Sequence, residues 1–202
     1  MTARGSAAGL GRDAPIEQRA PEIIRILSEA YPDAKVALRF SNPLEMLVAT
    51  ILSAQCTDEK VNEVTATLFV KYRTAEDYLK VPEDELKADI KPTGFFNQKA
   101  ISIREACRRI VEVYDGRVPD TMEDLITLRG VARKTANVVL GHALGVPGFA
   151  VDRHVLRVAN RLGIASSTEP DEVERQVTSA LPAERWTVAS DTLILHGRRV
   201  CK

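Results

Sequence analysis

The chain has 202 residues, 45% of them hydrophobic, and its 28 basic residues balance its 28 acidic ones. This length accommodates one large domain or two small ones, and the neutral balance does not by itself indicate a nucleic-acid binder. Three widely spaced cysteines exclude a local disulfide framework and favour a reducing compartment. Without a signal core or an apolar run of about 18 residues, the sequence predicts a cytoplasmic protein with no membrane contact.

Helical periodicity dominates the chain after Pro15, whereas strand signals are almost absent. We expect a disordered leader over residues 1–14, followed by an all-α protein of about ten helices. Apolar spacing, capping residues and Gly or Pro breakers give the bounds. In chain order the expected helices are 21–30, with Pro21 in the first turn, 43–53, 58–72, a short helix from 74, one after Pro82, 97–114, a short one after Thr121, 132–144, 152–161, 170–181 and 182–196.

The most informative segment is the turn from Leu128 to Lys134, which leads into an apolar helix. Gly130 permits a positive φ and a close approach to a ligand, so successive N–H groups and the helix start could form an anion site. Six basic residues and a single acid lie between residues 129 and 161. The basic ones are Arg129, Arg133, Lys134, Arg153, Arg157 and Arg161. A neutral protein with one basic face can bind DNA, because only the facing charges release counterions.

Lys134 and Asp152 form the candidate catalytic pair. Lys134 lies in the first turn of its helix, where the helix dipole, Arg133 and partial burial would each favour the neutral, nucleophilic amine. The segment 145–151 is long enough to run back along the helix and bring Asp152 near Lys134. A carboxylate there could accept a proton or stabilise positive charge on a sugar ring. Taken alone, Lys134 reads as a solvated lysine and Asp152 as a helix N-cap.

Five blocks of sequence together resemble the endonuclease III family of the helix-hairpin-helix DNA glycosylase superfamily. The blocks are Leu52–Asp58, Thr93–Ala100, the Lys134 motif, Val151–Val155 and Ile194–Cys201, and the resemblance covers about Pro21 to Cys201. It implies a two-lobed fold with the active site in the cleft between lobes. A six-helix lobe would span residues 36–146, and residues 15–35 and 147–202 would form the second lobe.

The resemblance implies a bifunctional glycosylase and AP lyase that excises oxidised pyrimidines from duplex DNA in base excision repair. Lys134 matches the nucleophile that attacks the sugar C1′ and forms a Schiff base, and Asp152 matches the assisting carboxylate. Gln55 and Phe95 match the side chains that fill the space of the flipped base. The resemblance thus implies that the partner is double-stranded DNA with damaged bases or abasic sites. The protein would bind this DNA as a monomer at the nucleoid.

Three residues depart from the family pattern around the proposed DNA contacts. The expected contacts besides Gln55 and Phe95 are Arg129, Gly130, Val131, Ala132, Arg133 and Arg153. Arg129 stands in place of proline, Ala132 in place of a second glycine, and Arg153 in place of threonine. If its position requires a positive φ, Ala132 is strained by about 1 kcal/mol or more, so we expect weaker or differently tuned DNA affinity.

The resemblance also implies a 4Fe-4S cluster held by four cysteines, of which only Cys201 is matched in these 202 residues. One thiolate cannot hold a cluster, and Cys56 and Cys107 do not match the missing ligands. Two interpretations stay open: a C-terminally incomplete sequence, which we favour, or a cluster-free form. His142, His154 and His196 have no metal-ligand spacing and are interpreted as packing or surface residues.

Two alternative functions stay open on sequence grounds. An adenine-mismatch glycosylase of the same superfamily generally lacks a lysine at the position of Lys134. A non-catalytic DNA-binding paralogue would be consistent with the unusual Arg129 and Ala132, but it would need neither Lys134 nor Asp152 as a pair.

Overall fold

The computed structural model describes residue 11 and residues 14–202, and all regular elements in this part of the chain are helical. The expected leader, residues 1–14, lies almost wholly outside the described residues. None of the helices in the described part is both long and apolar enough to cross a bilayer. The chain divides into two compact units, Lys35–Ala150 and Met1–Ala34 with Val151–Lys202. The lobes expected from the sequence divide after residues 35 and 146, and these bounds stay a prediction.

In the Lys35–Ala150 unit, four helices begin directly after a residue whose side chain caps them. Asn42, Thr57, Thr74 and Thr121 each accept a backbone N–H from the turn that they open, as expected from their positions. The elements are α2 (Pro43–Leu52), α3 (Asp58–Lys71), α4 (Ala75–Lys80), α5 (Glu83–Ile90), η1 (Lys91–Thr93), α6 (Phe96–Val113), α7 (Met122–Leu125), α8 (Arg133–Val139) and the π-helical turn η2 (Leu140–Leu144).

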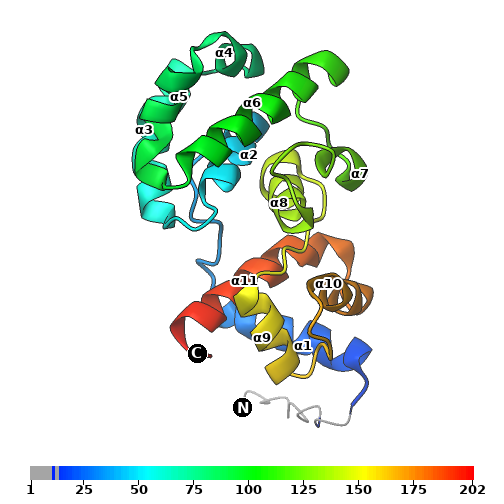
Figure 1. Cartoon of the computed structure of the whole chain (residues 1–202). Coiled ribbons are helices and arrows are strands. Elements are labelled where there is room, and N and C mark those ends of the chain that lie inside the picture. The colour runs from blue at the N-terminus through cyan, green and yellow to red at the C-terminus, as the bar shows by residue number, and fades with distance from the viewer. Residues whose placement is uncertain (1–10, 12–13) are drawn as a thin grey trace, which may run out of the picture. The chain divides into compact units, whose positions relative to one another are not determined.

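Helix α2 forms the centre of this unit. It is apolar nearly all round, and its buried residues are Met46, Leu47, Val48, Ala49, Ile51 and Leu52. It packs against α3, α6 and α8, while α6 also packs along α4 and α5 (Figure 1). Burial of each large side chain contributes about 1.5–3 kcal/mol, so α2 anchors the loops at both of its ends.

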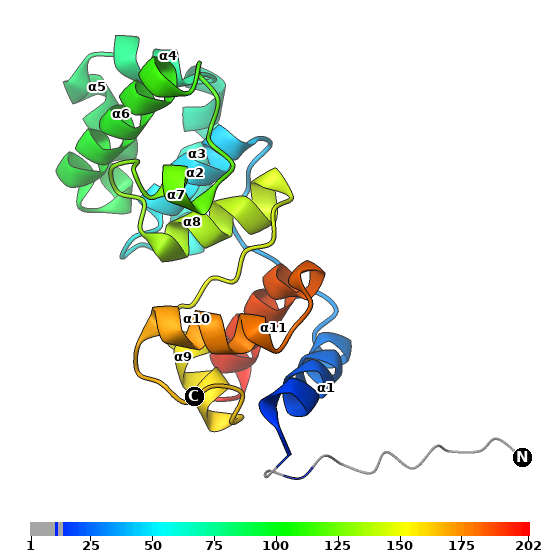
Figure 2. The ribbon, with the colours of Figure 1, turned by 90° about the vertical axis from the view of Figure 1, so that its right-hand side faces the viewer.

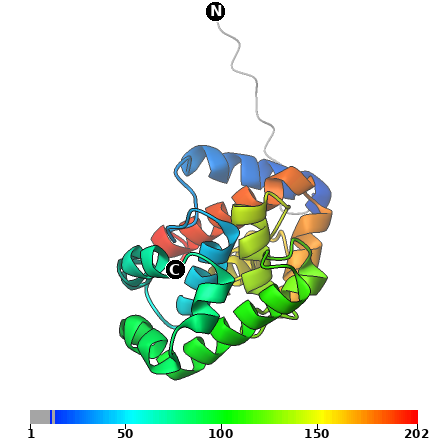
Figure 3. The same cartoon turned by 90° about the horizontal axis from the view of Figure 1, so that it is seen from above.

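The second unit contains α1 (Ile16–Ala30), α9 (Arg153–Arg161), α10 (Pro170–Ser179), η3 (Ala183–Arg185) and α11 (Trp186–Arg199). Helix α11 packs against α9 and lies alongside α1, as Figures 1 and 3 both show. Gly197 allows the close approach of α11 to α9, because a Cβ there would lie 2.9 Å from the Cβ of His154. Helix α11 thus holds α1 and α9, which are far apart in the sequence, together in one unit.

The expected start of the first helix at Pro21 is wrong. Helix α1 begins at Ile16 and contains Pro21 in its interior, although an interior proline costs about 3 kcal/mol or more. Pro21 is exposed, so the lost hydrogen bond faces solvent, whereas Ala20 and Ile24 are buried. The Arg19 guanidinium also donates to the carbonyl of Gly163 at 2.6 Å. Tertiary contacts of the added turn therefore outweigh the local signal.

Further helix bounds differ from those expected. Helix α10 ends at Ser179 rather than at residue 181, and α11 begins at Trp186, after the 3-10 turn η3, rather than at residue 182. The helix expected over 132–144 is α-helical only to Val139 and continues as the π-helical η2. The last helix extends beyond the expected His196 to Arg199.

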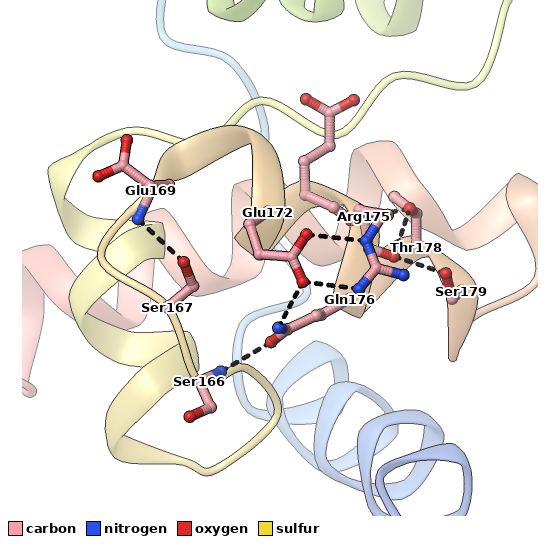
Figure 4. Close-up of polar contacts among 9 residues, drawn as sticks. Ser166, Ser167, Glu169, Glu172, Arg175, Gln176, Thr178 and Ser179 are labelled. Atoms are coloured by element: carbon pink, nitrogen blue, oxygen red, sulfur yellow. Dashed lines mark hydrogen bonds and ion pairs between the residues drawn. The ribbon is translucent and has the colours of Figure 1, made fainter.

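Polar contacts fix the loop before α10: the Glu172 carboxylate accepts from Arg175 and Gln176, and the Gln176 side chain accepts from the backbone N–H of Ser166 (Figure 4).

Candidate active site and nucleic-acid interface

A helical hairpin joins α7 to α8, and the connecting loop is residues 126–132 (Figure 2). Backbone bonds tighten it: the N–H of Leu128 donates to Leu125 and the N–H of Val131 donates to Leu128, both at 3.1 Å. Leu125, Leu128 and Val131 are buried, so the loop is anchored from inside while Arg129 and Gly130 are exposed. The apolar positions thus turn the intervening backbone toward solvent.

Gly130 has the positive φ that its place in the turn predicts, +82°. A Cβ there would lie 2.8 Å from the Cβ of Ser102 on α6, closer than real side chains approach. Two independent constraints therefore select glycine: the left-handed backbone and the contact with α6.

Ala132 is not strained. It is the N-cap of α8 with φ −89° and ψ 169°, extended backbone that any residue adopts. The expected strain cost is therefore wrong, and a change in DNA affinity cannot come from this source. Alanine instead leaves α8 without a side-chain cap. The N–H groups of a helix's first turn have no intrahelical acceptor, so here they depend on another partner.

Lys134 is exposed in the first turn of α8, next to Arg133, which is also exposed. Arg129 lines a hollow of about 270 Å³ together with Arg108, Arg109, Glu105 and Glu112, and Arg108 forms an ion pair with Glu105. The hairpin therefore presents a cationic edge, while the amine of Lys134 lies at the start of a helix as expected.

The segment after α8 runs back along that helix. The side-chain oxygen of buried Asn137 accepts the backbone N–H of Phe149 at 3.1 Å. Gly148 packs so closely on the same residue that a Cβ would lie 2.3 Å from the Asn137 carbonyl oxygen. Asn137 lies three residues after Lys134. The expected return of the chain toward Lys134 is thus present as far as Phe149, three residues before Asp152.

Asp152 opens helix α9 as its N-cap. Its Oδ1 accepts the backbone N–H groups of His154 at 2.7 Å and Val155 at 2.8 Å. Both bonds go to one oxygen, so the cap orients the carboxylate and leaves Oδ2 outside it. Asp152 belongs to one unit and Lys134 to the other. The pairing of the two groups therefore stays a prediction.

Gln55 and Phe95 share an uncommon backbone conformation. They are non-glycine residues at positive φ, 53° and 48°, on the loops that follow α2 and precede α6. Both are exposed, and 63% of Phe95 is accessible to solvent although it is a large apolar side chain. A packing role for Phe95 would have buried it. The exposed aromatic is consistent with a residue that contacts a partner.

Sequence reasoning did not single out Lys99, although it lies in a quoted block. Its side chain is only 5% exposed, and its Nζ donates to the carbonyls of Leu52 at 2.8 Å and Thr93 at 2.7 Å. Burial lowers the pKa of this amine. A detectable signal existed: Lys99 falls on the apolar face of α6 at helical spacing from Ile103, Ala106 and Ile110.

The six basic residues do not form one uniform set. Arg157 donates to the carbonyls of Gly197 and Cys201, and Arg161 donates to the carbonyl of Lys202, so both hold the end of the chain. Arg153 is exposed at the first position of α9. Arg129, Arg133 and Lys134 lie in the other unit. Two of the six basic residues thus have structural contacts in the second unit, and phosphate contacts by the others stay a prediction.

The cysteines present do not fit an iron–sulfur cluster. Cys201 lies in one unit and Cys56 and Cys107 in the other, and within the described residues no group of three His, Cys, Asp or Glu could hold a metal. Burial raises the pKa of the Cys107 thiol to about 12, which disfavours the thiolate that iron requires. The Cys201 sulfur instead accepts from Arg161 at 3.4 Å.

His196 and His154 each have a hydrogen-bonding partner. The Nδ1 of His196 is 2.9 Å from the Tyr31 hydroxyl, and the Nδ1 of His154 is 3.2 Å from the Arg157 guanidinium. These contacts fit the structural interpretation of both residues. His142 is partly buried in η2.

Comparison with known proteins places this arrangement in a family. The model of the HhH-GPD superfamily base excision DNA repair proteins matches residues 48–183. The endonuclease III of Synechocystis sp. is 50% identical over 92% of this chain and 85% of its own length, and that of Bacillus subtilis is 48% identical over 87% and 81%.

A solved structure described as a trapped endonuclease III–DNA covalent intermediate superposes with a TM-score of 0.87 at 43% identity, covering 92% of this chain and 88% of that one. The residues matched by the family model include the helical hairpin, the loops of Gln55 and Phe95, and the segment that returns from α8. The chain belongs to the endonuclease III family of the HhH-GPD superfamily of base excision DNA repair proteins.

Proposed function

We propose that this protein is a bifunctional DNA glycosylase and AP lyase that excises oxidised pyrimidines from duplex DNA through Lys134. Membership in the endonuclease III family supports glycosylase and lyase activity. The observation that carries the assignment of the nucleophile is the exposed lysine in the first turn of α8, directly after the Gly130 turn.

The chemistry follows from the amine. The Lys134 nitrogen attacks C1′ of the damaged nucleotide, and the bond from C1′ to the base breaks. The ring opens to a Schiff base between the lysine and C1′. Loss of a C2′ proton then breaks the bond from C3′ to its oxygen and cuts the strand on the 3′ side of the lesion. The nucleophile in the first step is the neutral amine of the lysine.

Asp152 is the proposed assisting carboxylate. Its Oδ1 is held by the α9 cap, which fixes the side chain and leaves Oδ2 to accept a proton or stabilise a positive sugar ring. The return of the chain to Asn137 supports this role. Phe149 is anchored one helical turn from Lys134, and three residues of chain span at most about 11 Å.

Gln55 and Phe95 are the proposed fillers of the gap left by an extruded nucleotide. Extrusion costs a few kcal/mol in stacking and pairing, which an inserted aromatic ring and a hydrogen-bonding amide offset. The exposure of Phe95 supports this role, because burial would have prevented it. Arg129, Gly130, Val131, Ala132, Arg133 and Arg153 are the remaining proposed contacts, with the phosphate backbone as their target.

The proposed partner is duplex DNA that carries a damaged base or an abasic site. A solved relative is described as a non-covalent endonuclease III–DNA complex, with a TM-score of 0.87 at 43% identity. We infer that the protein acts as a monomer in the cytoplasm, in association with the nucleoid. These two statements rest on the proposed function.

Borohydride trapping tests the nucleophile. Wild-type protein is incubated with a duplex that carries one oxidised thymine, and borohydride reduces any Schiff base to a stable protein–DNA adduct. We expect an adduct from wild type and none from Lys134→Gln. Lys80→Gln, at an exposed lysine at the end of α4, controls for the lost charge and should trap normally. An adduct of undiminished yield from Lys134→Gln would refute the assignment.

A further inference from the structure

The two loops that carry Gln55 and Phe95 are joined by one buried side chain. Leu52 ends α2 three residues before Gln55, and Thr93 lies two residues before Phe95. The Nζ of Lys99 donates to both carbonyl oxygens, at 2.8 and 2.7 Å. One amine therefore holds the two carbonyl oxygens close together, although Leu52 and Thr93 are 41 positions apart in the sequence.

Burying the Lys99 amine costs free energy, and this cost indicates that its two hydrogen bonds have a specific role. A buried amine loses its hydration, and burial accordingly lowers the pKa of Lys99. An apolar residue at this helical position would pack without that cost, but it would leave the carbonyls of Leu52 and Thr93 without these donors. Gln55 and Phe95 also occupy left-handed backbone, which persists only where the surroundings impose it. A hydrogen-bonded tie beside each loop provides such surroundings.

Helix α6 links the tie to the rest of the site. Phe95 is its N-cap, Lys99 lies in its first turns, and Ser102, one turn later, contacts Gly130 of the hairpin. Helix α6 therefore positions the Phe95 loop directly, the Gln55 loop through Lys99, and the hairpin through Ser102. All of them lie within the Lys35–Ala150 unit.

We infer that Lys99 is a positioning residue, which holds the loops of Gln55 and Phe95 in the mutual register needed to enter duplex DNA together. The inference rests on the proposed function and deepens it. Without the tie the two loops move independently, and each insertion must then be ordered at the moment of binding. Lys99 itself touches no DNA in this account, and its effect is on extrusion of the nucleotide.

The chain provides a matched control on the same helix. The guanidinium of Arg104 donates to the carbonyls of Tyr78, Leu79 and Val81, near the end of α4. Arg104 is thus also a cation of α6 that ties backbone carbonyls, but it holds neither the Gln55 nor the Phe95 loop. Lys99→Met and Arg104→Met each remove one such tie, so both should lower the melting temperature.

The test measures extrusion at a temperature where each variant remains folded by circular dichroism. A duplex with 2-aminopurine beside the lesion reports unstacking by its fluorescence, and single-turnover excision is followed in the same samples. We expect Lys99→Met to lower the extrusion and excision rates about 10- to 100-fold, as small misplacements do, and Arg104→Met to change neither. Equal rates in the two variants would overturn the inference.

A double-mutant cycle separates positioning from general damage. If Lys99 acts through Phe95, Lys99→Met should lower extrusion much less in a Phe95→Ala protein than in wild type. Additive effects would overturn the inference. Lys99→Gln, which keeps amide donors on a shorter side chain, replaces Lys99→Met if the latter does not fold. Failure of the proposed function is distinguishable, because wild type would then show no excision at all.

Discussion

Helices α8 and α9 begin in opposite ways. The residue immediately before α8 is Ala132, which offers no side-chain cap. The residue immediately before α9 is Asp152, whose Oδ1 accepts two backbone N–H groups. An alanine cap costs about 0.5–2 kcal/mol relative to Asp, Asn, Ser or Thr. The open start of α8 therefore gives up stability that the closed start of α9 keeps. Under the proposed function, a bound DNA phosphate would supply acceptors to α8, whereas the α9 cap holds the Asp152 carboxylate in a fixed orientation.

The largest effect on the excision rate should follow from a substitution that removes the carboxylate of Asp152 but keeps its helix cap. Asparagine caps helices as well as aspartate, so Asp152→Asn should keep the melting temperature but lose proton transfer and charge. We expect single-turnover excision to fall about 10²- to 10⁴-fold. Asp152→Ala should lose about 1 kcal/mol of stability in addition. Urea denaturation and single-turnover kinetics measure both quantities. An unchanged rate in Asp152→Asn would leave Asp152 as a cap only.

A cost in stability should follow from Gly130→Ala. The left-handed backbone costs alanine about 1–2 kcal/mol, and crowding against Ser102 adds about 1–3 kcal/mol. Gly145→Ala is the matched control, because Gly145 has φ +68° and a Cβ added there would meet nothing within 4 Å. The difference in unfolding free energy between the two variants isolates the contact with α6. Equal losses would show that the hairpin shifts to relieve it.

Closing the start of α8 should weaken DNA binding while stabilising the fold. Ala132→Asp supplies a cap of about 1 kcal/mol, but it also places a negative charge where a phosphate is proposed to lie. We expect affinity for duplex DNA to fall about tenfold, an effect of about 1.4 kcal/mol. Ala132→Asn adds the cap without the charge, and should weaken binding less. Fluorescence anisotropy measures the affinities. Tighter binding by Ala132→Asp would contradict a phosphate at this position.

The smallest effect should come from one arginine beside the open start. Arg129→Ala should lower DNA affinity uniformly across sequences and reduce the slope of log affinity against log salt by about 1. Arg117→Ala, at an exposed arginine after α6, controls for the change in net charge. Titrations at several salt concentrations give the slopes. If both variants keep the wild-type slope, Arg129 makes no phosphate contact.

Much of the fold was predictable because its signals are local. Thr57, Thr74 and Thr121 cap the helices that the sequence assigns to them, and Gly130 has its expected positive φ. Errors arose where tertiary contacts decide. Pro21 reads as a helix start, yet burial of Ala20 extends α1 upstream of it.

The positions of Lys134 and Asp152 at helix starts were predictable, whereas their chemical roles stay predictions. Lys134 and Asp152 follow from the chemistry of amines and carboxylates, and their locations at helix starts follow from capping patterns. Lys99 was missed because its role depends on two carbonyls from distant segments, which no local pattern encodes. The strain expected at Ala132 was inferred from a glycine in relatives, and the backbone there needs none.

The contact of Gly148 with Asn137 limits how far Asp152 can move from α8. With Phe149 fastened to α8, Asp152 is linked to that helix by a tether of only a few residues. A short tether gives an intramolecular pair a high effective concentration, on the order of millimolar, which falls as the linker lengthens beyond the span. Under the proposed pairing of the two groups, insertion of glycines after Ala150 should therefore lower the effective concentration of the Asp152 carboxylate at the Lys134 amine without altering either residue.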